Sequence, residues 1–301
     1  MMKPTLIILA AGMGSRYGGL KQVDGLGPYG ETIIDYSVYD AIRAGFGKVI
    51  FVIRRSIEED FMKIFGNRFS RDVNFDIVFQ ELDMLPDNIT CPPGREKPWG
   101  TAHAVWVARK MVNEPFAVIN ADDFYGYDTF KTLANELSRS NLKNGQYFMV
   151  GFRLNNTLSE QGSVSRGACE VDNASFLKSI VEFTRIQRVD GKIFNIDDSG
   201  NRIELDGSML VSMNFWGFTQ DFFTLTETLL KEFLNGIPDH QKSEIYIPTV
   251  VNRAIQDGLA TCKVLSTTSE WFGVTYPGDK IHVVDQLRKL TLNGVYPSPL
   301  W

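Results

Sequence analysis

The sequence contains few of the residues that carry out covalent catalysis or build metal and disulfide frameworks. It has three cysteines, Cys91, Cys169 and Cys262, and three histidines among 301 residues. Because the cysteines are odd in number and far apart, they indicate neither a disulfide framework nor a paired zinc motif. The histidines are scattered, and no triad-like grouping accompanies them. This composition is typical of a reducing compartment, so we expect a cytoplasmic protein.

Basic clusters and long apolar runs are also missing. The 31 Lys and Arg residues against 36 Asp and Glu residues give a net charge of −5, whereas a nucleic-acid-binding surface needs a basic stripe. The first apolar run, residues 5–9, is too short for a signal peptide or a membrane span. We therefore expect neither nucleic acid nor a membrane as a partner. The length allows a large core, and we expect a single domain over 1–301.

A glycine-rich segment directly follows this apolar run, with the sequence Leu-Ala-Ala-Gly-Met-Gly-Ser-Arg-Tyr-Gly-Gly-Leu-Lys-Gln (residues 9–22). Four glycines in eight residues let the backbone turn and approach a ligand, so its N–H groups can point at an anion while Arg16 and Lys21 add positive charge. The segment predicts a triphosphate-binding loop. It lacks the Gly-Lys-Ser/Thr end of a Walker loop, and Tyr17 replaces a glycine of the dinucleotide fingerprint. A surface turn with two solvated cations is the alternative.

Strands and helices alternate in the first half of the chain. Apolar runs predict buried strands at 48–53, 74–79 and 115–119. Helical periodicity predicts a helix over 31–44 that ends at Gly45, and a capping box at Ser56 predicts another helix running towards Phe65. The alternation predicts an α/β fold, with a Rossmann-like, mainly parallel sheet flanked by helices and ligands at the carboxyl ends of the strands. The glycine-rich segment lies at such an end.

The pattern changes in the second half. After a strand over 146–152, short strands separated by turns over 155–212 predict an antiparallel β-rich substrate region. Residues 83–99 are rich in Pro, Asp, Asn and Gly, which predicts a long excursion without regular structure. The remaining expected elements are a strand over 208–218, helices over 220–233 and 244–255, a strand over 261–265 and a final helix over 280–292.

Two acidic residues, Asp122 and Asp123, follow the strand at 115–119. This position is poor for packing but suits a divalent cation held over phosphate oxygens. For Asp123, capping of the next helix is an equal alternative. His103 lies within an expected helix, and we predict a packed or helix-surface histidine rather than a ligand.

These segments resemble the sugar-1-phosphate nucleotidylyltransferases, the NDP-sugar pyrophosphorylase family that includes glucose-1-phosphate thymidylyl- and uridylyltransferases. Residues 9–16 match the family's Leu-Ala-Ala-Gly-x-Gly-x-Arg, and Lys21 falls on the lysine that follows it. The resemblance implies a fold of the nucleotide-diphospho-sugar transferase type and catalytic roles for Arg16 and Lys21. It also implies that the triphosphate is bound by Ala10, Ala11, Gly12 and Gly14.

The resemblance implies further site residues. Gln80, Gly100 and Thr101 match the segments that frame the nucleotide base, although a polar strand-end residue is the alternative for Gln80. Asp122 falls on the metal-binding aspartate, which implies Mg²⁺. The sugar-phosphate site is implied to contain Gly167, Glu182 and Asn214, the last in the place of a family glycine.

Two segments depart from the family pattern. Phe183-Thr184 replaces the Lys-Pro that follows the glutamate, so the lysine that holds the sugar phosphate is missing, and Arg166 or Arg185 is a candidate for its charge. The segment over 270–279 carries a second metal ligand in the family. Here the aligned residue is Gly273 or Thr275.

A sugar 1-phosphate is already an anionic nucleophile, so attack on the α-phosphorus of a nucleoside triphosphate requires positioning and charge neutralisation rather than a Ser, Cys or His. We expect Mg²⁺-dependent transfer of a nucleotidyl group from UTP or dTTP to a sugar 1-phosphate. Residues 1–152 are the expected nucleotide-binding half and 153–301 the sugar-phosphate-binding half. Transfer to another phosphorylated acceptor, such as phosphocholine, and a catalytically silent NDP-sugar-binding regulatory protein are the alternatives. A homo-oligomer is left open.

Overall fold

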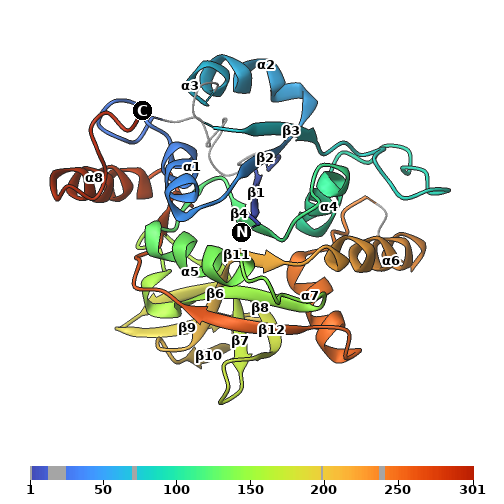
Figure 1. The fold of residues 1–301 in the computed structure, drawn as a ribbon. Helices are drawn as coiled ribbons and strands as arrows, with labels where there is room; N and C mark the ends of the chain where they lie inside the picture. Colours follow the sequence, from blue (N-terminus) through green and yellow to red (C-terminus); the bar gives the residue numbers. More distant parts are fainter. Residues whose placement is uncertain (1, 13–24, 70–72, 198, 237–240) are drawn as a thin grey trace.

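The computed structural model describes residues 2–12, 25–69, 73–197, 199–236 and 241–301. Most of its strands form one large sheet with the order β10-β9-β8-β7-β11-β4-β1-β2-β3, and β6 pairs with both β11 and β12 (Figure 1). The parallel strands are β1 (Thr5–Leu9), β2 (Lys48–Ile53), β3 (Phe75–Phe79) and β4 (Phe116–Asn120). This sheet, with the helices described next, confirms the predicted α/β class.

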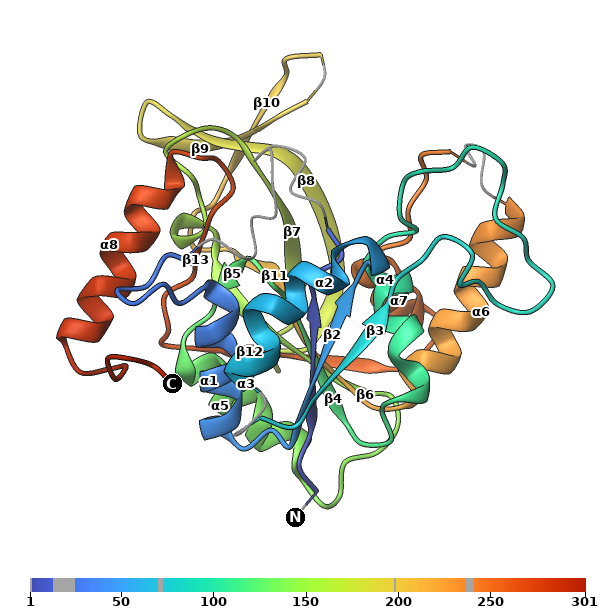
Figure 2. The ribbon, with the colours of Figure 1, turned by 90° about the horizontal axis from the view of Figure 1, so that it is seen from above.

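Helices cover both faces of the parallel strands, which explains why β1, β2 and β4 are apolar along most of their length. Leu6 and Ile8 of β1 pack in one core with side chains of α1 (Ile33–Ala44), α3 (Asn67–Phe69) and α5 (Tyr127–Leu137). Ile7 packs in a second core with α4 (Thr101–Val107), α6 (Asp221–Gly236) and α7 (Ile247–Gln256). Figure 2 shows these two groups of helices on opposite sides of the strands.

The helix predicted to begin with a capping box at Ser56 differs from the structure. Arg55–Ile57 is a 3-10 helix, α2 spans Glu58–Phe61, and Met62–Gly66 is a π-helical turn. Within the described chain no side chain caps α2, so the predicted capping box is wrong. Tertiary packing decides this segment, because the rings of Phe61, Phe65 and Phe69 surround Phe51 with centroid distances of 5.0, 6.4 and 5.9 Å.

A capping box does begin α1, where Thr32 and Asp35 bond each other's backbone. The Asp35 N–H donates to Thr32 Oγ1 at 3.3 Å, and the Thr32 N–H donates to Asp35 Oδ2 at 2.6 Å. Gly45 ends the helix with a φ of +105°, as the sequence predicts.

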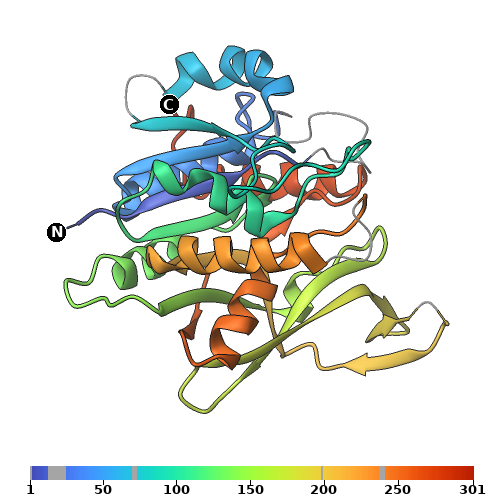
Figure 3. The ribbon, with the colours of Figure 1, turned by 90° about the vertical axis from the view of Figure 1, so that its right-hand side faces the viewer.

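Antiparallel strands follow from residue 146. They are β6 (Gln146–Arg153), β7 (Val164–Val171), β8 (Leu177–Val189), β9 (Lys192–Ile196), β10 (Arg202–Leu205) and β11 (Leu210–Phe218), and β12 (Thr261–Ser266) adds parallel to β6. Figure 3 shows the olive and yellow strands of 164–205 on the opposite side of the molecule from α2 and α3. The predicted antiparallel region is therefore present.

Strand β11 joins the two kinds of sheet. Its residues Val211 and Ser212 pair with β7, whereas Trp216 to Phe218 pair with β4. The register shifts between Ser212 and Trp216, and Asn214 lies in that irregular stretch with a φ of +58°. The parallel and antiparallel strands are therefore parts of one continuous sheet.

The C-terminal segment returns to the first half of the chain. Strand β13 (Phe272–Gly273) pairs with β5 (Asp123–Phe124), and α8 (Asp279–Leu292) follows. Val283 and Leu287 of α8 are buried in a small core with Tyr36 and Phe124. The division into halves at residue 152 stays a prediction, and the structure places part of the second half against the first.

Three further observations concern expectations from the sequence. Residues 83–99, all of which the structure describes, contain no helix or strand, as predicted. The three cysteines are free. In the described part of the chain, no helix combines the length and apolarity needed to cross a membrane.

Candidate functional site

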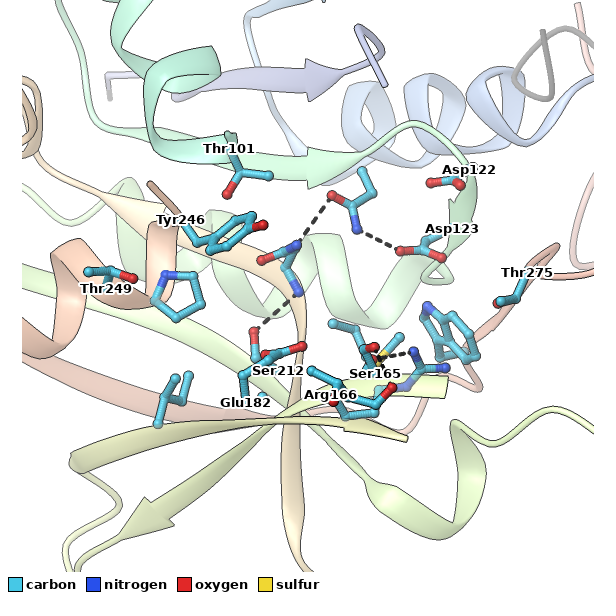
Figure 4. Close-up of a pocket in the computed structure, with 18 of the residues that line it drawn as sticks. Thr101, Asp122, Asp123, Ser165, Arg166, Glu182, Ser212, Tyr246, Thr249 and Thr275 are labelled. Atoms are coloured by element: carbon cyan, nitrogen blue, oxygen red, sulfur yellow. Dashed lines mark hydrogen bonds between the residues drawn. The ribbon is translucent and has the colours of Figure 1, made fainter. Parts of the chain in front are cut away.

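A cavity of about 820 Å³ lies between the carboxyl end of β4 and the antiparallel strands β7 and β8. Figure 4 shows Asp122 and Asp123 on one side of this cavity and Ser165, Arg166 and Glu182 on the opposite side. The volume lies within the usual range for small-molecule sites. Five of the predicted site residues line it: Thr101, Asp122, Gly167, Glu182 and Asn214.

The two aspartates at the end of β4 differ in their surroundings. Asp123 is 9% exposed, and its Oδ2 accepts a hydrogen bond from Asn120 Nδ2 at 2.9 Å, with the Tyr125 hydroxyl at 3.3 Å. Asp122 is half-buried and lines the cavity. The next helix, α5, has Gly126 as its N-cap and no side-chain cap bond from the described residues, so the alternative in which Asp123 caps that helix is wrong.

The segment expected to carry a second metal ligand lies beside these aspartates. Gly273 pairs with Asp123 across β13 and β5, and Thr275 lines the cavity. A Cβ at position 273 would lie 2.7 Å from Asp123 Oδ1 and 3.2 Å from the Asp122 carbonyl oxygen. A side chain at position 273 would therefore require the carboxylate of Asp123 to move.

The nearby carboxylate of Asp279 is already engaged. It accepts hydrogen bonds from the N–H groups of Thr275 and Tyr276 at 3.0 and 2.8 Å and from Ser159 Oγ at 2.7 Å. Among the residues that the structure describes, no group of three or more His, Cys, Asp and Glu side chains could hold a metal. Because Mg²⁺ is usually bound by one or two carboxylates together with substrate phosphates, Asp122 and Asp123 suit an ion that arrives with a triphosphate.

Arg166 brings a buried cation to the cavity. Its Nε donates to the Thr157 carbonyl oxygen at 3.1 Å, its Nη1 donates to the Ser165 carbonyl oxygen at 2.8 Å, and the guanidinium lies 4.9 Å from the centroid of the Trp271 ring. Burial lowers the pKa of Arg166 to about 10, and the nearby carboxylates of Asp123 and Glu182 oppose this shift. Arg166 therefore stays charged at neutral pH.

The other candidate for the missing lysine's charge is not in the cavity. Arg185 is exposed, and its Nη1 donates to the Asp197 carbonyl oxygen at 3.3 Å. Of the two arginines considered from the sequence, Arg166 is the one that lines the cavity.

The predicted acceptor residues lie together. Gly167 pairs with Glu182 across β7 and β8, and a Cβ at 167 would contact Glu182 Oε2 at 3.4 Å. Desolvation raises the pKa of Glu182, and Arg166 lowers it in part. Asn214 has a φ of +58°, a conformation that asparagine tolerates better than most residues, so it can replace the family's glycine. Its Oδ1 accepts from Trp216 Nε1 at 3.2 Å.

The residues expected at the nucleotide base lie at one end of the cavity or beside it. Gly100 has a φ of +101°, and a Cβ there would lie 2.3 Å from the Ile245 carbonyl oxygen, so only glycine fits. Thr101 Oγ1 accepts from the Ile247 N–H at 3.1 Å and so links the starts of α4 and α7. Gln80 lines a separate, smaller cavity with His103, and His103 is fully buried, as predicted.

The start of the glycine-rich segment lies at the same edge as Asp122. Ala10 donates its N–H to the Val52 carbonyl oxygen at 2.8 Å, and the Ala121 N–H donates to the Leu9 carbonyl oxygen at 3.2 Å. Ala11 is buried and Gly12 is exposed. Gly14, Arg16 and Lys21 lie outside the described residues, so their roles stay predictions.

Several lining residues were not found from the sequence. Tyr246 and Thr249 border the cavity because α7 begins there, and Trp271 reaches it from the segment before β13. The helical pattern near 244–255 predicts α7 but carries no sign of which end faces a ligand. Only the tertiary arrangement supplies that information.

Residues 5–166 match a protein-family model described as nucleotidyl transferase. An inositol-1-phosphate CTP transferase from T. maritima has a similar structure, with 14% identity, 95% of this chain and 96% of that chain covered, and a TM-score of 0.60. A UDP-glucose pyrophosphorylase complexed with UDP-glucose gives 17% identity, 95% and 98% coverage, and a TM-score of 0.59. A Bacillus anthracis protein assigned as a glucose-1-phosphate thymidylyltransferase has 16% identity, with 94% of this chain and 95% of that chain covered, and a TM-score of 0.60. At these identities the likeness shows the fold, and no curated protein sequence matches.

Proposed function

We propose, from the premise that this chain belongs to the nucleotidyl transferase family, that the enzyme transfers a nucleotidyl group from UTP or dTTP to a sugar 1-phosphate. The family match covers residues 5–166, which is more than half of the chain. We further propose that the transfer depends on Mg²⁺. The products are an NDP-sugar and pyrophosphate.

One observation carries this proposal: the cavity has a carboxylate edge and a buried cation facing each other. Asp122 lies at the end of β4, next to the start of the glycine-rich segment, and Arg166 lies on the opposite wall (Figure 4). A site that joins two phosphorylated substrates needs both a way to hold a metal–triphosphate and a positive charge for the second phosphate. This cavity offers one of these groups on each side.

On the nucleotide side, the backbone after β1 would hold the triphosphate, with Arg16 and Lys21 adding charge. Asp122, with Asp123 beside it, would hold Mg²⁺, which when bound neutralises phosphate charge. The acceptor's phosphate oxygen attacks the α-phosphorus, a new P–O bond forms, and the bond from the α-phosphorus to the bridging oxygen breaks, so pyrophosphate leaves. Because the acceptor is already an anion, no protein nucleophile or general base is required.

On the acceptor side, the polar groups suit a phosphorylated polyol. The carboxylate of Glu182 can accept hydrogen bonds from hydroxyl groups, and the amide of Asn214 can both donate and accept. Arg166 provides the charge that Phe183-Thr184 lacks, since a guanidinium binds phosphate oxygens well. Gly167 leaves space beside Glu182 because it has no side chain.

A second acceptor class is favoured by one specific observation. The Lys-Pro that would follow Glu182 is absent, and one protein of similar fold is named an inositol-1-phosphate CTP transferase. Transfer to a phosphorylated acceptor other than a sugar 1-phosphate is therefore the second candidate. The catalytically silent regulatory protein stays a third candidate, because neither position 273 nor position 275 carries a carboxylate that could serve as a second metal ligand.

The test is a matrix of nucleoside triphosphates against sugar 1-phosphates and other phosphorylated acceptors, including phosphocholine and inositol 1-phosphate, with pyrophosphate release as the readout. We expect turnover with UTP or dTTP and a sugar 1-phosphate, dependent on Mg²⁺, and at least ~10²-fold less in Asp122→Asn. Turnover only with a non-sugar acceptor would select the second candidate. No pyrophosphate in any combination would overturn both.

A further inference from the structure

One side-chain amide connects the end of β3 to the start of α4. Gln80 is 8% exposed, and its Nε2 lies 3.1 Å from the Gly100 carbonyl oxygen and 3.1 Å from His103 Nδ1. His103 is fully buried, and its Nε2 lies 2.6 Å from the Met84 carbonyl oxygen. These contacts form a hydrogen-bonded chain from the 83–99 excursion through His103 and Gln80 to the first turn of α4.

The chemistry of the partners fixes which atom of each group donates. A carbonyl oxygen only accepts, so His103 Nε2 carries the hydrogen that binds Met84. Burial lowers the pKa of His103 to about 4, so the ring is neutral at pH 7 and its Nδ1 is an acceptor. Gln80 therefore faces two acceptors, His103 Nδ1 and the Gly100 oxygen.

Two acceptors require the two hydrogens of the Gln80 NH₂ group. The flipped amide would place Oε1 against both acceptors and lose both hydrogen bonds. The hydrogen-bond partners therefore fix the orientation of the Gln80 amide. The oxygen is consequently the polar atom that Gln80 can offer to a ligand.

Gln80 and His103 line a cavity of about 130 Å³, with Arg54, Glu96 and Trp99 among its other walls. This volume is well below the roughly 300–1,000 Å³ that is usual for a whole small molecule, so the cavity suits one ring of a larger ligand. Thr101, two residues before His103 on the same helix, lines the large cavity. A nucleotide with its phosphates in the large cavity can therefore extend its base around the start of α4.

We propose that His103 is a positioning residue for base selection: it holds Gln80 so that the amide oxygen accepts a hydrogen bond from the N3–H of uracil or thymine. The proposal rests on the proposed function and on the place beside the nucleotide base that the family resemblance implies for Gln80. Uracil and thymine carry a donor at N3, whereas cytosine has a bare nitrogen there. A fixed acceptor opposite that nitrogen would disfavour cytosine, because neither group would then be paired.

Two variants of His103 separate this role from a structural one, since each keeps only one of its two hydrogen bonds, to Gln80 or to Met84. His103→Asn keeps an acceptor near the position of Nδ1 and loses the bond to Met84. His103→Gln keeps a donor that can reach Met84 and loses the acceptor for Gln80. Val105→Ala is the control, because Val105 is fully buried on the same helix and its apolar side chain cannot hydrogen-bond to Gln80.

The measurement is the dissociation constant of UTP, of dTTP and of CTP by calorimetry in the presence of Mg²⁺, with thermal unfolding of each protein alongside. We expect the wild type to prefer UTP. In His103→Gln, the dissociation constant of CTP divided by that of UTP should fall about tenfold, which is the scale of one hydrogen bond. His103→Asn and Val105→Ala should keep the wild-type ratio. In turnover, His103→Gln should raise the KM for UTP and leave kcat nearly unchanged.

Equal losses of UTP and CTP affinity in both His103 variants would show that His103 only supports the fold and would overturn the proposal. A wild type that prefers CTP would overturn it as well. If the wild type binds none of UTP, dTTP and CTP, the proposed function itself fails, and this inference fails with it. Binding of UTP with an unchanged ratio in His103→Gln overturns this inference alone.

Discussion

Replacing the two adjacent aspartates one at a time should separate catalysis from stability. Asp122→Asn removes a carboxylate that lines the cavity and is only half-buried. Asp123→Asn removes a carboxylate that is 9% exposed, is bonded to Asn120 and offsets the buried charge of Arg166. The first change should affect mainly turnover and the second mainly the free energy of unfolding.

The magnitudes follow from this difference in burial and bonding. A hydrogen bond to a charged group contributes about 1.5–3 kcal/mol, and the amide introduced by Asp123→Asn keeps one acceptor oxygen, so we expect this variant to lower the free energy of unfolding by about 2 kcal/mol. For a chain of this size that corresponds to a fall in Tm of roughly 3 °C. Asp122→Asn should stay within about 0.5 kcal/mol of the wild type, since its carboxylate faces the cavity and is partly solvated.

The assays are thermal unfolding and pyrophosphate release over a range of Mg²⁺ concentrations. We expect turnover to fall at least ~10²-fold in Asp122→Asn and by about tenfold or less in Asp123→Asn. If Asp123→Asn is the less active protein and keeps the wild-type Tm, the assignment of the metal-binding carboxylate is shifted by one residue and the reasoning is refuted.

Four further outcomes are expected. Lys21→Ala should lower turnover at least ~10²-fold with an unchanged Tm, and a wild-type rate would remove the glycine-rich segment from catalysis. Calorimetry should detect Mg²⁺ binding only together with the nucleoside triphosphate; tight binding without nucleotide, lost in Asp279→Asn, would reveal a second carboxylate ligand. Gly273→Ala should cost about 1–3 kcal/mol and reduce turnover, because its Cβ would displace Asp123, and urea unfolding checks this. Burial raises the pKa of Asp40 to about 6, so the folded state binds its proton more tightly than the unfolded state. Stability should therefore fall by about 2 kcal/mol relative to Asp40→Asn as the pH rises from about 4 to 6, measured from urea curves at both ends of that window.

The parts of the fold set by short-range patterns were predictable from the sequence. The bounds of β1 and β2 agree with the apolar runs, and α1 ends at Gly45 as expected. Asp122 could be placed at the sheet edge because the carboxyl ends of parallel strands gather ligands. This rule predicted the edge of the site that contains Asp122. The residues proposed for the acceptor, Gly167, Glu182 and Asn214, came only from the family resemblance.

Features that depend on pairing between distant segments were not predictable. Nothing near Gly273 indicates that it lies against Asp123, whose side chain a Cβ at position 273 would displace. Arg166 was one of two candidates until the pairing of β7 with β8 turned it towards the cavity. The π-helical turn at 62–66 reflects aromatic packing in the core, which no local propensity encodes.

The pairing of β13 with β5 also sets the earliest time at which the edge of the cavity beside Asp123 can be complete during synthesis. The partners Asp123 and Gly273 are about 150 residues apart in the chain. At about 5–20 residues per second, a ribosome needs roughly 8–30 s to make the second after the first. Throughout that interval the nascent chain carries β5 without its pairing partner. The edge of the cavity beside Asp123 is therefore among the last parts of the described chain to assemble.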